Sequence, residues 1–94
     1  MPRVVLAPAL ARWITPAGTS VGDVAMDVEG ADLASVLNQV FAGYPHLRGY
    51  VLDEHGAIRH HLTLFADGSA VRDKRALSHP VRAELYVMQA LSGG

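Results

Sequence analysis

The sequence predicts an α+β domain in which a mixed sheet of four to five strands packs on one main helix. Three observations indicate this fold class. Residues 3–7 are rich in β-branched side chains and stop at Pro8, residues 24–28 place an apolar side chain at every second position, and residues 33–44 repeat apolar side chains at helical spacing. An amphipathic helix of this length is marginal in water by itself, so its apolar stripe needs a sheet to pack on.

The first two strands are expected to form a hairpin. Turn-forming residues at positions 15–20 separate the first strand from the second. In the second strand, Val24, Met26 and Val28 occupy the even positions, which therefore face the core, and Gly30 ends the strand.

The main helix has both a start signal and a stop signal. Asp32 precedes the first apolar residue and can accept backbone N–H bonds as an N-cap. Gly43 and Pro45 end the pattern. The predicted buried stripe of this helix consists of Leu33, Val36, Leu37, Val40, Phe41 and Tyr44.

The second half of the chain predicts the remaining strands. Residues 45–56 are irregular and are expected to hold a short helical turn at the edge of the core. Residues 58–65 predict a strand with Ile58, Leu62 and Leu64 on its inner face and Phe65 on its outer face.

A tight turn and a final strand complete the pattern. Asp67-Gly68 is a strong hairpin signal, and Val71 begins the return. Residues 73–82 are polar and predict a loop, and residues 84–91 predict the last strand. The order β-β-α-β-(short β)-β describes a β-grasp (ubiquitin-like) domain over residues 1–91, followed by a flexible tail, residues 92–94.

Composition excludes several classes of function. The 94 residues carry a net charge of −1 with no basic stripe, which argues against nucleic-acid binding. No apolar run approaches the roughly 20 residues that cross a bilayer, and the N-terminus does not have the pattern of a signal peptide. The chain has no cysteine, so it has no disulfide or thiol nucleophile, and we expect a cytoplasmic protein.

The last residues are the strongest functional feature. Gly93 and Gly94 follow the predicted last strand after Ser92 alone, and such a tail has the smallest possible cross-section. It can thread a terminal carboxylate into another protein's active site. ATP can convert that carboxylate to an acyl-adenylate, and sulfide or a persulfide can then produce a thiocarboxylate.

A terminal Gly-Gly also has ordinary explanations, such as a frayed end or a proteolytic stop. Two features favour the functional interpretation, namely the position of the glycines directly after a strand and the β-grasp order of the whole chain. We therefore expect Gly94 to carry the reactive carboxylate and Gly93 to support its passage.

The chain resembles the MoaD/ThiS family of ubiquitin-like sulfur carriers over essentially its whole length. The resemblance rests on the first strand, the helix with its Tyr44-Pro45-His46-Leu47 end, the turn at residues 52–56, residues 62–72 with the Asp67-Gly68 turn, and Ser92-Gly93-Gly94. Two stretches depart from the family pattern: residues 78–83 replace an Asp-Gly-Asp stretch, and residues 86–91 replace an Ile-Leu-Pro-type sequence.

The resemblance implies two partners and no bound cofactor. One partner is an ATP-dependent activating enzyme related to ubiquitin-activating enzymes, which uses the ATP. The other is an enzyme that uses the sulfur, such as the large subunit of a molybdopterin synthase or another biosynthetic synthase. Phe65, Tyr86 and Met88 are predicted to face away from the helix and, with Ser92, to form the partner-docking site. The alternative for this apolar face is a homodimer contact or a covering loop.

Three functions remain open at this point. The first is a sulfur carrier, for molybdopterin, thiamine, cysteine or a thio-metabolite. The second is a ubiquitin-like modifier conjugated through Gly94, for which the single lysine, Lys74, disfavours chain formation. The third is a non-catalytic interaction domain. None of the three makes the chain itself an enzyme.

Other polar residues predict no site. His60 and His61 are adjacent in a predicted strand, so they point to opposite faces and cannot easily share a metal. Asp53 and Glu54 are neighbours in a turn, where solvated charge is the better explanation than a catalytic pair. No metal site is expected.

Overall fold

The alternating residues near the N-terminus form the predicted hairpin. In the computed structural model, which describes residues 1–16 and 22–89, β1 (Arg3–Leu6) pairs antiparallel with β2 (Val24–Asp27). Val24 and Met26 pack against the core, while Ala25 and Asp27 are exposed. The even-numbered residues of β2 therefore face the core, as the alternation in the sequence predicts.

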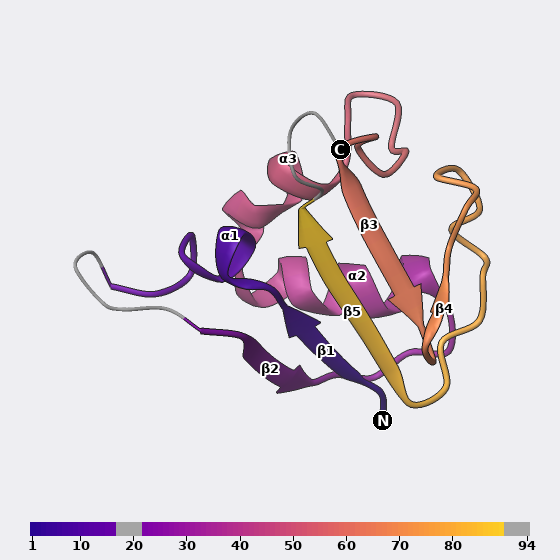
Figure 1. Cartoon of the computed structure of the whole chain (residues 1–94), viewed down its shortest axis with the longest axis horizontal. Coiled ribbons are helices and arrows are strands. Elements are labelled where there is room, and N and C mark those ends of the chain that lie inside the picture. Colours follow the sequence, from indigo (N-terminus) through magenta and orange to yellow (C-terminus); the bar gives the residue numbers. More distant parts are fainter. Residues whose placement is uncertain (17–21, 90–94) are drawn as a thin grey trace.

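β5 (Glu84–Gln89) occupies the centre of the sheet. It runs parallel to β1 on one side and antiparallel to β3 (Leu62–Ala66) on the other. β4 (Ser69–Ala70) pairs antiparallel with β3 at the edge of the sheet, and the strand order is β2-β1-β5-β3-β4 (Figure 1). The predicted α+β class with a mixed sheet, in the β-grasp arrangement, is confirmed.

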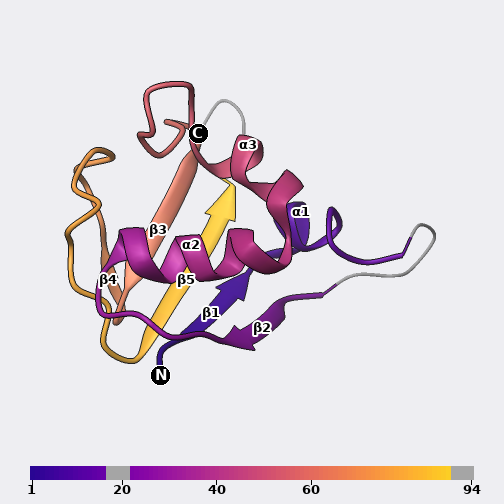
Figure 2. The same cartoon turned by 180° about the vertical axis from the view of Figure 1, so that it is seen from behind.

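The main helix, α2 (Leu33–Gly43), crosses one face of this sheet (Figure 2). Its start is capped in both directions: Ser35 N–H donates to Asp32 Oδ1 at 2.9 Å, and Asp32 N–H donates to Ser35 Oγ at 3.2 Å. Five of the six residues of the predicted stripe are buried, and Tyr44 packs half-buried beside them. The helix ends at Gly43, before Pro45, as predicted.

Three short helical segments lie around α2 and the sheet. The predicted turn after the main helix consists of η1 (Pro45–Leu47) and α3 (Arg48–Val51), and it buries Leu47 and Val51. α1 (Pro8–Ala11) has no signal in the sequence, because four residues are too few to show a helical period. No helix in the described part of the chain is long and apolar enough to cross a membrane.

The expected strand over residues 58–65 was placed too early. β3 begins at Leu62, because the N–H of Leu62 donates to the carbonyl of Arg59 at 3.0 Å and closes a turn. Ile58 reaches the core separately, through an isolated bridge to Leu52. His60 and His61 therefore lie in a turn and not in a strand, with ring centroids 6.0 Å apart.

The Asp67-Gly68 turn connects β3 and β4 as predicted, but the return strand begins at Ser69 and not at Val71. Both turn residues have positive φ, 52° and 86°, as a two-residue type I′ hairpin turn requires. The Asp67 carboxylate also accepts backbone N–H bonds from Arg82, Ala83 and Glu84. This turn therefore sets the start of β5 as well as the end of β3.

Candidate docking face and carrier tail

The predicted reactive residues lie outside the described residues. These are Gly93 and Gly94, together with Ser92. The last described residue of β5 is Gln89, which pairs with Leu62 at the start of β3. The part of the site that the structure describes is therefore the sheet from which the chain continues toward these residues.

The three apolar residues predicted for docking lie on one face of the sheet. Leu85 and Val87 are fully buried on the α2 side of β5, so Tyr86 and Met88 between and after them point to the opposite face. Phe65 on β3 pairs directly with Tyr86. The structure thus brings Phe65, Tyr86 and Met88 together, and their role in docking stays a prediction.

The rim of this docking face is polar. The hydroxyl of Tyr86 donates to Asp23 Oδ1 at 3.4 Å. Desolvation raises the pKa of Tyr86, and the negative charge of Asp23 raises it further. The face therefore presents a neutral phenol beside apolar side chains, which suits contact with another protein.

Lys74, the single lysine, lies near the carboxyl end of β5. Its ammonium group donates to the carbonyl of Leu62, the residue that pairs with Gln89. The side chain is half-buried and held against the sheet.

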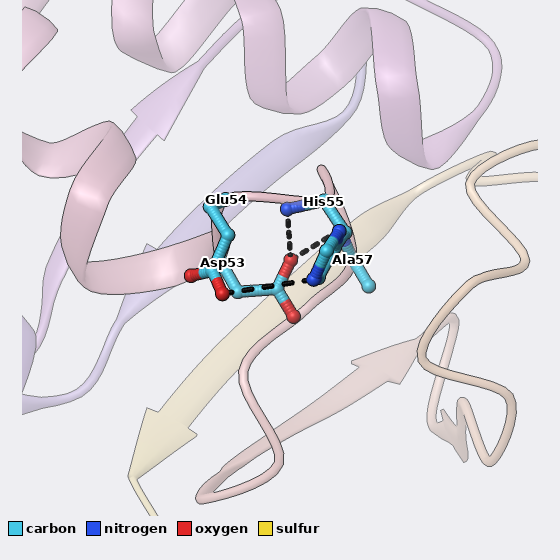
Figure 3. A network of polar contacts seen from close by, with 4 residues as sticks. All are labelled: Asp53, Glu54, His55 and Ala57. Carbon is cyan, nitrogen blue, oxygen red and sulfur yellow. Dashed lines mark hydrogen bonds and ion pairs between the residues drawn. The ribbon is translucent and has the colours of Figure 1, made fainter.

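Asp53 and Glu54 do not form a catalytic pair. Asp53 Oδ1 accepts N–H bonds from His55 at 2.8 Å and Ala57 at 3.1 Å, which close the turn that contains them (Figure 3). These bonds, with that from His55 the largest cause, lower the pKa of Asp53. Glu54 lies 3.6 Å from the ring of His55 at an exposed position. The sequence predicts a solvated charge at Asp53. The structure shows instead that its carboxylate stabilises the turn through backbone hydrogen bonds.

A cavity of about 480 Å³ beside the same turn is bordered by His55, Gly56, Ala57, Arg75 and Leu77. Of the predicted site residues, the three that the structure describes, Phe65, Tyr86 and Met88, are not among these. Among residues 1–16 and 22–89, no three His, Asp or Glu side chains come together as a group that could hold a metal ion.

Two exposed aromatic residues, Trp13 and Tyr50, contact each other. The rings of Trp13 and Tyr50 stack with centroids 4.6 Å apart and planes 10° apart. The two residues are far apart in the chain, so no local pattern could pair them.

The sheet order and the single crossing helix define the class of the protein: it is a small ubiquitin-like β-grasp protein. Solved structures of the same size share this fold over nearly their whole length. SAMP1 from Haloferax volcanii is 26% identical, with a TM-score of 0.65 over 98% of this chain and 99% of that one.

Two further structures agree with this match. Small archaeal modifier protein 1 (SAMP1) from Methanosarcina acetivorans is 20% identical, with a TM-score of 0.65 over 100% of this chain and 98% of that one. A chain of the Amycolatopsis orientalis BexX/CysO complex is 15% identical, with a TM-score of 0.69 over 97% and 99%. The last two identities are low and establish the shared fold alone.

The resemblance to MoaD/ThiS-type ubiquitin-like proteins is confirmed by the full-length match to SAMP1 from Haloferax volcanii. No protein-family model and no curated protein sequence matches the chain.

Proposed function

We propose that this protein is a sulfur carrier whose working group is the α-carboxylate of Gly94. The observation that carries the proposal is the full-length correspondence with SAMP1, combined with a Ser92-Gly93-Gly94 segment that follows the central strand β5. In this proposal residues 1–91 form the domain that the partner enzymes bind, and residues 92–94 form the tail that enters the active site of the partner.

The chemistry takes place on the tail in two balanced steps. The Gly94 carboxylate attacks the α-phosphorus of ATP, which forms an acyl-adenylate and releases pyrophosphate. Hydrosulfide then attacks the acyl carbon, AMP leaves with the acyl oxygen, and the thiol proton passes to solvent. The product is a thiocarboxylate, which donates its sulfur to an acceptor bound by a second enzyme.

The chain itself supplies no catalytic side chain in this scheme. It binds no cofactor, and ATP is consumed by the activating enzyme, which is related to ubiquitin-activating enzymes. The acceptor enzyme is of the molybdopterin synthase large-subunit type or another biosynthetic synthase. A cysteine-free chain of net charge −1 suits a cytoplasmic carrier that binds neither nucleic acid nor membrane, and that has no thiol to attack its own activated terminus.

Phe65, Tyr86 and Met88 form the docking face for these partners in the proposal, with Ser92 as the first residue of the threaded tail. The support is geometric. The three side chains share the outer face of the two strands, β3 and β5, that pair at the exit of the tail.

Intact-protein mass spectrometry tests the proposal. The full chain is incubated with a candidate activating enzyme, ATP and sulfide, beside a variant that lacks Gly94. The mass before incubation checks that Gly94 bears the free carboxylate. We expect one oxygen to be exchanged for one sulfur in the full chain and no change in the shortened one. The activating enzyme is first shown to convert another carrier protein. If the mass of the full chain is then the same before and after incubation, the proposal is refuted.

A second candidate function is protein modification through Gly94. It is favoured by the name of two of the structural matches, small archaeal modifier protein 1. The hydrogen bond that holds Lys74 against Leu62 favours single attachments over chains built on this lysine. Gly-Gly remnants on lysines of other proteins, found by peptide mass spectrometry, would support modification. If deletion of Gly93 and Gly94 has no biochemical effect, the third interpretation, an interaction domain, remains.

A further inference from the structure

The stacked pair of Trp13 and Tyr50 is an exposed feature of an otherwise well-buried chain. Each of the two side chains is 39% exposed, and Met1 is the only other large apolar residue among residues 1–16 and 22–89 that is exposed to this extent. Aromatic rings of this size normally contribute to a core or an interface. The neighbouring short helices α1, η1 and α3 bury Leu10, Leu47 and Val51 in the core.

The pair is held in place before any partner binds. The guanidinium carbon of Arg12 lies 4.6 Å from the centre of the Trp13 ring. Nε2 of His46 lies 2.7 Å from the carbonyl oxygen of Trp13 and joins the segment after α1 to η1. A prearranged aromatic surface loses little conformational entropy on binding.

The segments that build this surface carry positive charge only. Residues 8–16, 44–52 and 58–62 contain Arg12, Arg48 and Arg59 and no Asp or Glu. Arg59 joins them by donating from Nε to the carbonyl of Gly49 at 2.8 Å. We call the surface made by Trp13, Tyr50, Arg12 and Arg59 the aromatic–arginine surface.

The acidic residues nearest to this surface in the sequence are Asp23, Asp53 and Glu54, and the exposed Glu54 lies 3.6 Å from the ring of His55. The carboxylate of Asp53 is occupied by the N–H groups of its own turn, and Asp23 accepts from Tyr86. Besides these N–H bonds, that from His55 first, the positive charge of Arg59 helps to lower the pKa of Asp53, so these two charges interact, whereas Arg12 belongs to no described ion pair.

The aromatic–arginine surface lies at the end of the sheet where the chain leaves β5. Both views place α1 and α3 beside the carboxyl end of β5 (Figures 1 and 2). Ala7 N–H donates to the carbonyl of Val87 at 2.9 Å, and Leu62, the last residue of the third segment, pairs with Gln89. A protein that takes up residues 92–94 must therefore approach this end.

We propose that the aromatic–arginine surface binds the enzyme that activates the tail, at a surface of that enzyme with an apolar centre and an acidic rim. The inference rests on the proposed function for the identity of that enzyme. Trp, Tyr and Arg are the residues that most often dominate binding energy at protein interfaces. The exposed Arg12 and the half-buried Arg59 select an acidic rim, and their charges make the association depend on salt.

Binding and conversion are measured separately, so that the two proposals can fail independently. The full chain is titrated into the candidate activating enzyme by calorimetry at low and high salt, and conversion is followed by intact mass. The variants are Trp13→Ala and Arg12→Glu, with Arg72→Glu, beside the edge strand β4, as the matched charge control. Circular dichroism and urea unfolding verify that each variant is folded.

We expect Trp13→Ala and Arg12→Glu each to raise Kd at least about tenfold, Arg72→Glu to leave it unchanged, and the wild-type Kd to rise with salt. Wild-type Kd values for both variants, or no binding by the wild-type chain, would overturn the docking proposal. If the chain binds the enzyme but Gly94 is not converted, the proposed function as a sulfur carrier is refuted. The Kd values of the variants then decide the docking proposal by themselves.

Arginines beside exposed aromatic rings could also bind RNA, and a titration tests this alternative. A single-stranded RNA oligonucleotide is added to the protein while the fluorescence of Trp13 is recorded. We expect no saturable change. Tight RNA binding that Arg12→Glu abolishes would overturn the assignment of this surface to a protein partner.

Discussion

Oδ1 of Asp67 accepts a hydrogen bond of 2.7 Å from the backbone N–H of Ala83, which ties the β3–β4 turn to the start of β5. Bonds from Arg82 and Glu84 complete the set around this carboxylate. Asp67 therefore serves two connections: its backbone adopts the positive φ of the tight turn, and its carboxylate holds the entry into the central strand.

Replacement of Asp67 by Asn is expected to lower the urea midpoint of unfolding at pH 7. The N–H bonds, that from Ala83 first, lower the pKa of Asp67 below its ordinary value. The carboxylate therefore stabilises the fold above the unfolded pKa of about 3.9, and this stabilisation is lost as the pH falls through the folded pKa. The difference between wild type and Asp67→Asn should shrink below about pH 4. A difference that grows in acid would contradict this account.

Truncation of Leu64 should be among the costly changes. Leu64 is 1% exposed in the core, so Leu64→Ala is expected to cost about 2–5 kcal/mol in the free energy of unfolding. Its neighbour Thr63 lies half-buried on the outer face, and Thr63→Ala is expected to cost about 1 kcal/mol or less. Urea unfolding measures both variants, and equal costs would mean that the two faces of β3 are wrongly assigned.

Gly30 and Gly43 should respond in opposite directions to alanine. Gly30 has φ +139°, and an added Cβ would lie 2.7 Å from Ser35 Oγ, so Gly30→Ala should cost about 1–3 kcal/mol. Gly43 lies in α2 with open space around it, so Gly43→Ala should add about 0.4–1 kcal/mol of stability. Thermal unfolding of the pair provides the comparison, and a neutral Gly30→Ala would count against the close approach to α2.

Tyr86 should titrate above the ordinary tyrosine pKa of about 10, because it is desolvated and lies beside Asp23. Ultraviolet absorbance between pH 8 and 12, with Tyr86→Phe subtracted, isolates it from the other two tyrosines. Asp23→Asn removes the neighbouring charge and should lower the pKa of Tyr86. No change in that variant would exclude the contact between the two side chains.

A negative charge on the docking face should weaken partner binding while the fold survives. Phe65→Asp and Met88→Asp each place a carboxylate on the outer face of the sheet, where a docked protein would have to desolvate it. Gln39→Asp adds the same charge on the exposed face of α2 and serves as the control. Calorimetry with the activating enzyme should show at least about a tenfold rise in Kd for the first two variants and none for the control. Unchanged binding in folded Phe65→Asp and Met88→Asp would remove these residues from the docking site.

Some of the fold could be predicted because it depends on neighbours in the sequence. The N-cap at Asp32 and the turn at Asp67-Gly68 are set by short-range hydrogen bonds and by φ preferences, which act within a few residues. The predicted beginning of β3 was wrong because Ile58 is an apolar residue that pairs with Leu52 outside any strand. A local pattern cannot distinguish these two ways of burying an isoleucine.

The sequence by itself determined the α+β class, the helix stripe and the outward direction of Phe65, Tyr86 and Met88, because periodicity is a property of consecutive residues. The tertiary structure alone decided that β1 and β5 are adjacent and parallel, and that Trp13 stacks on Tyr50 beside the end of β5. These pairings join residues distant in the chain, and the energy that selects them is the burial of a shared core, which exists only once the sheet and helix have come together.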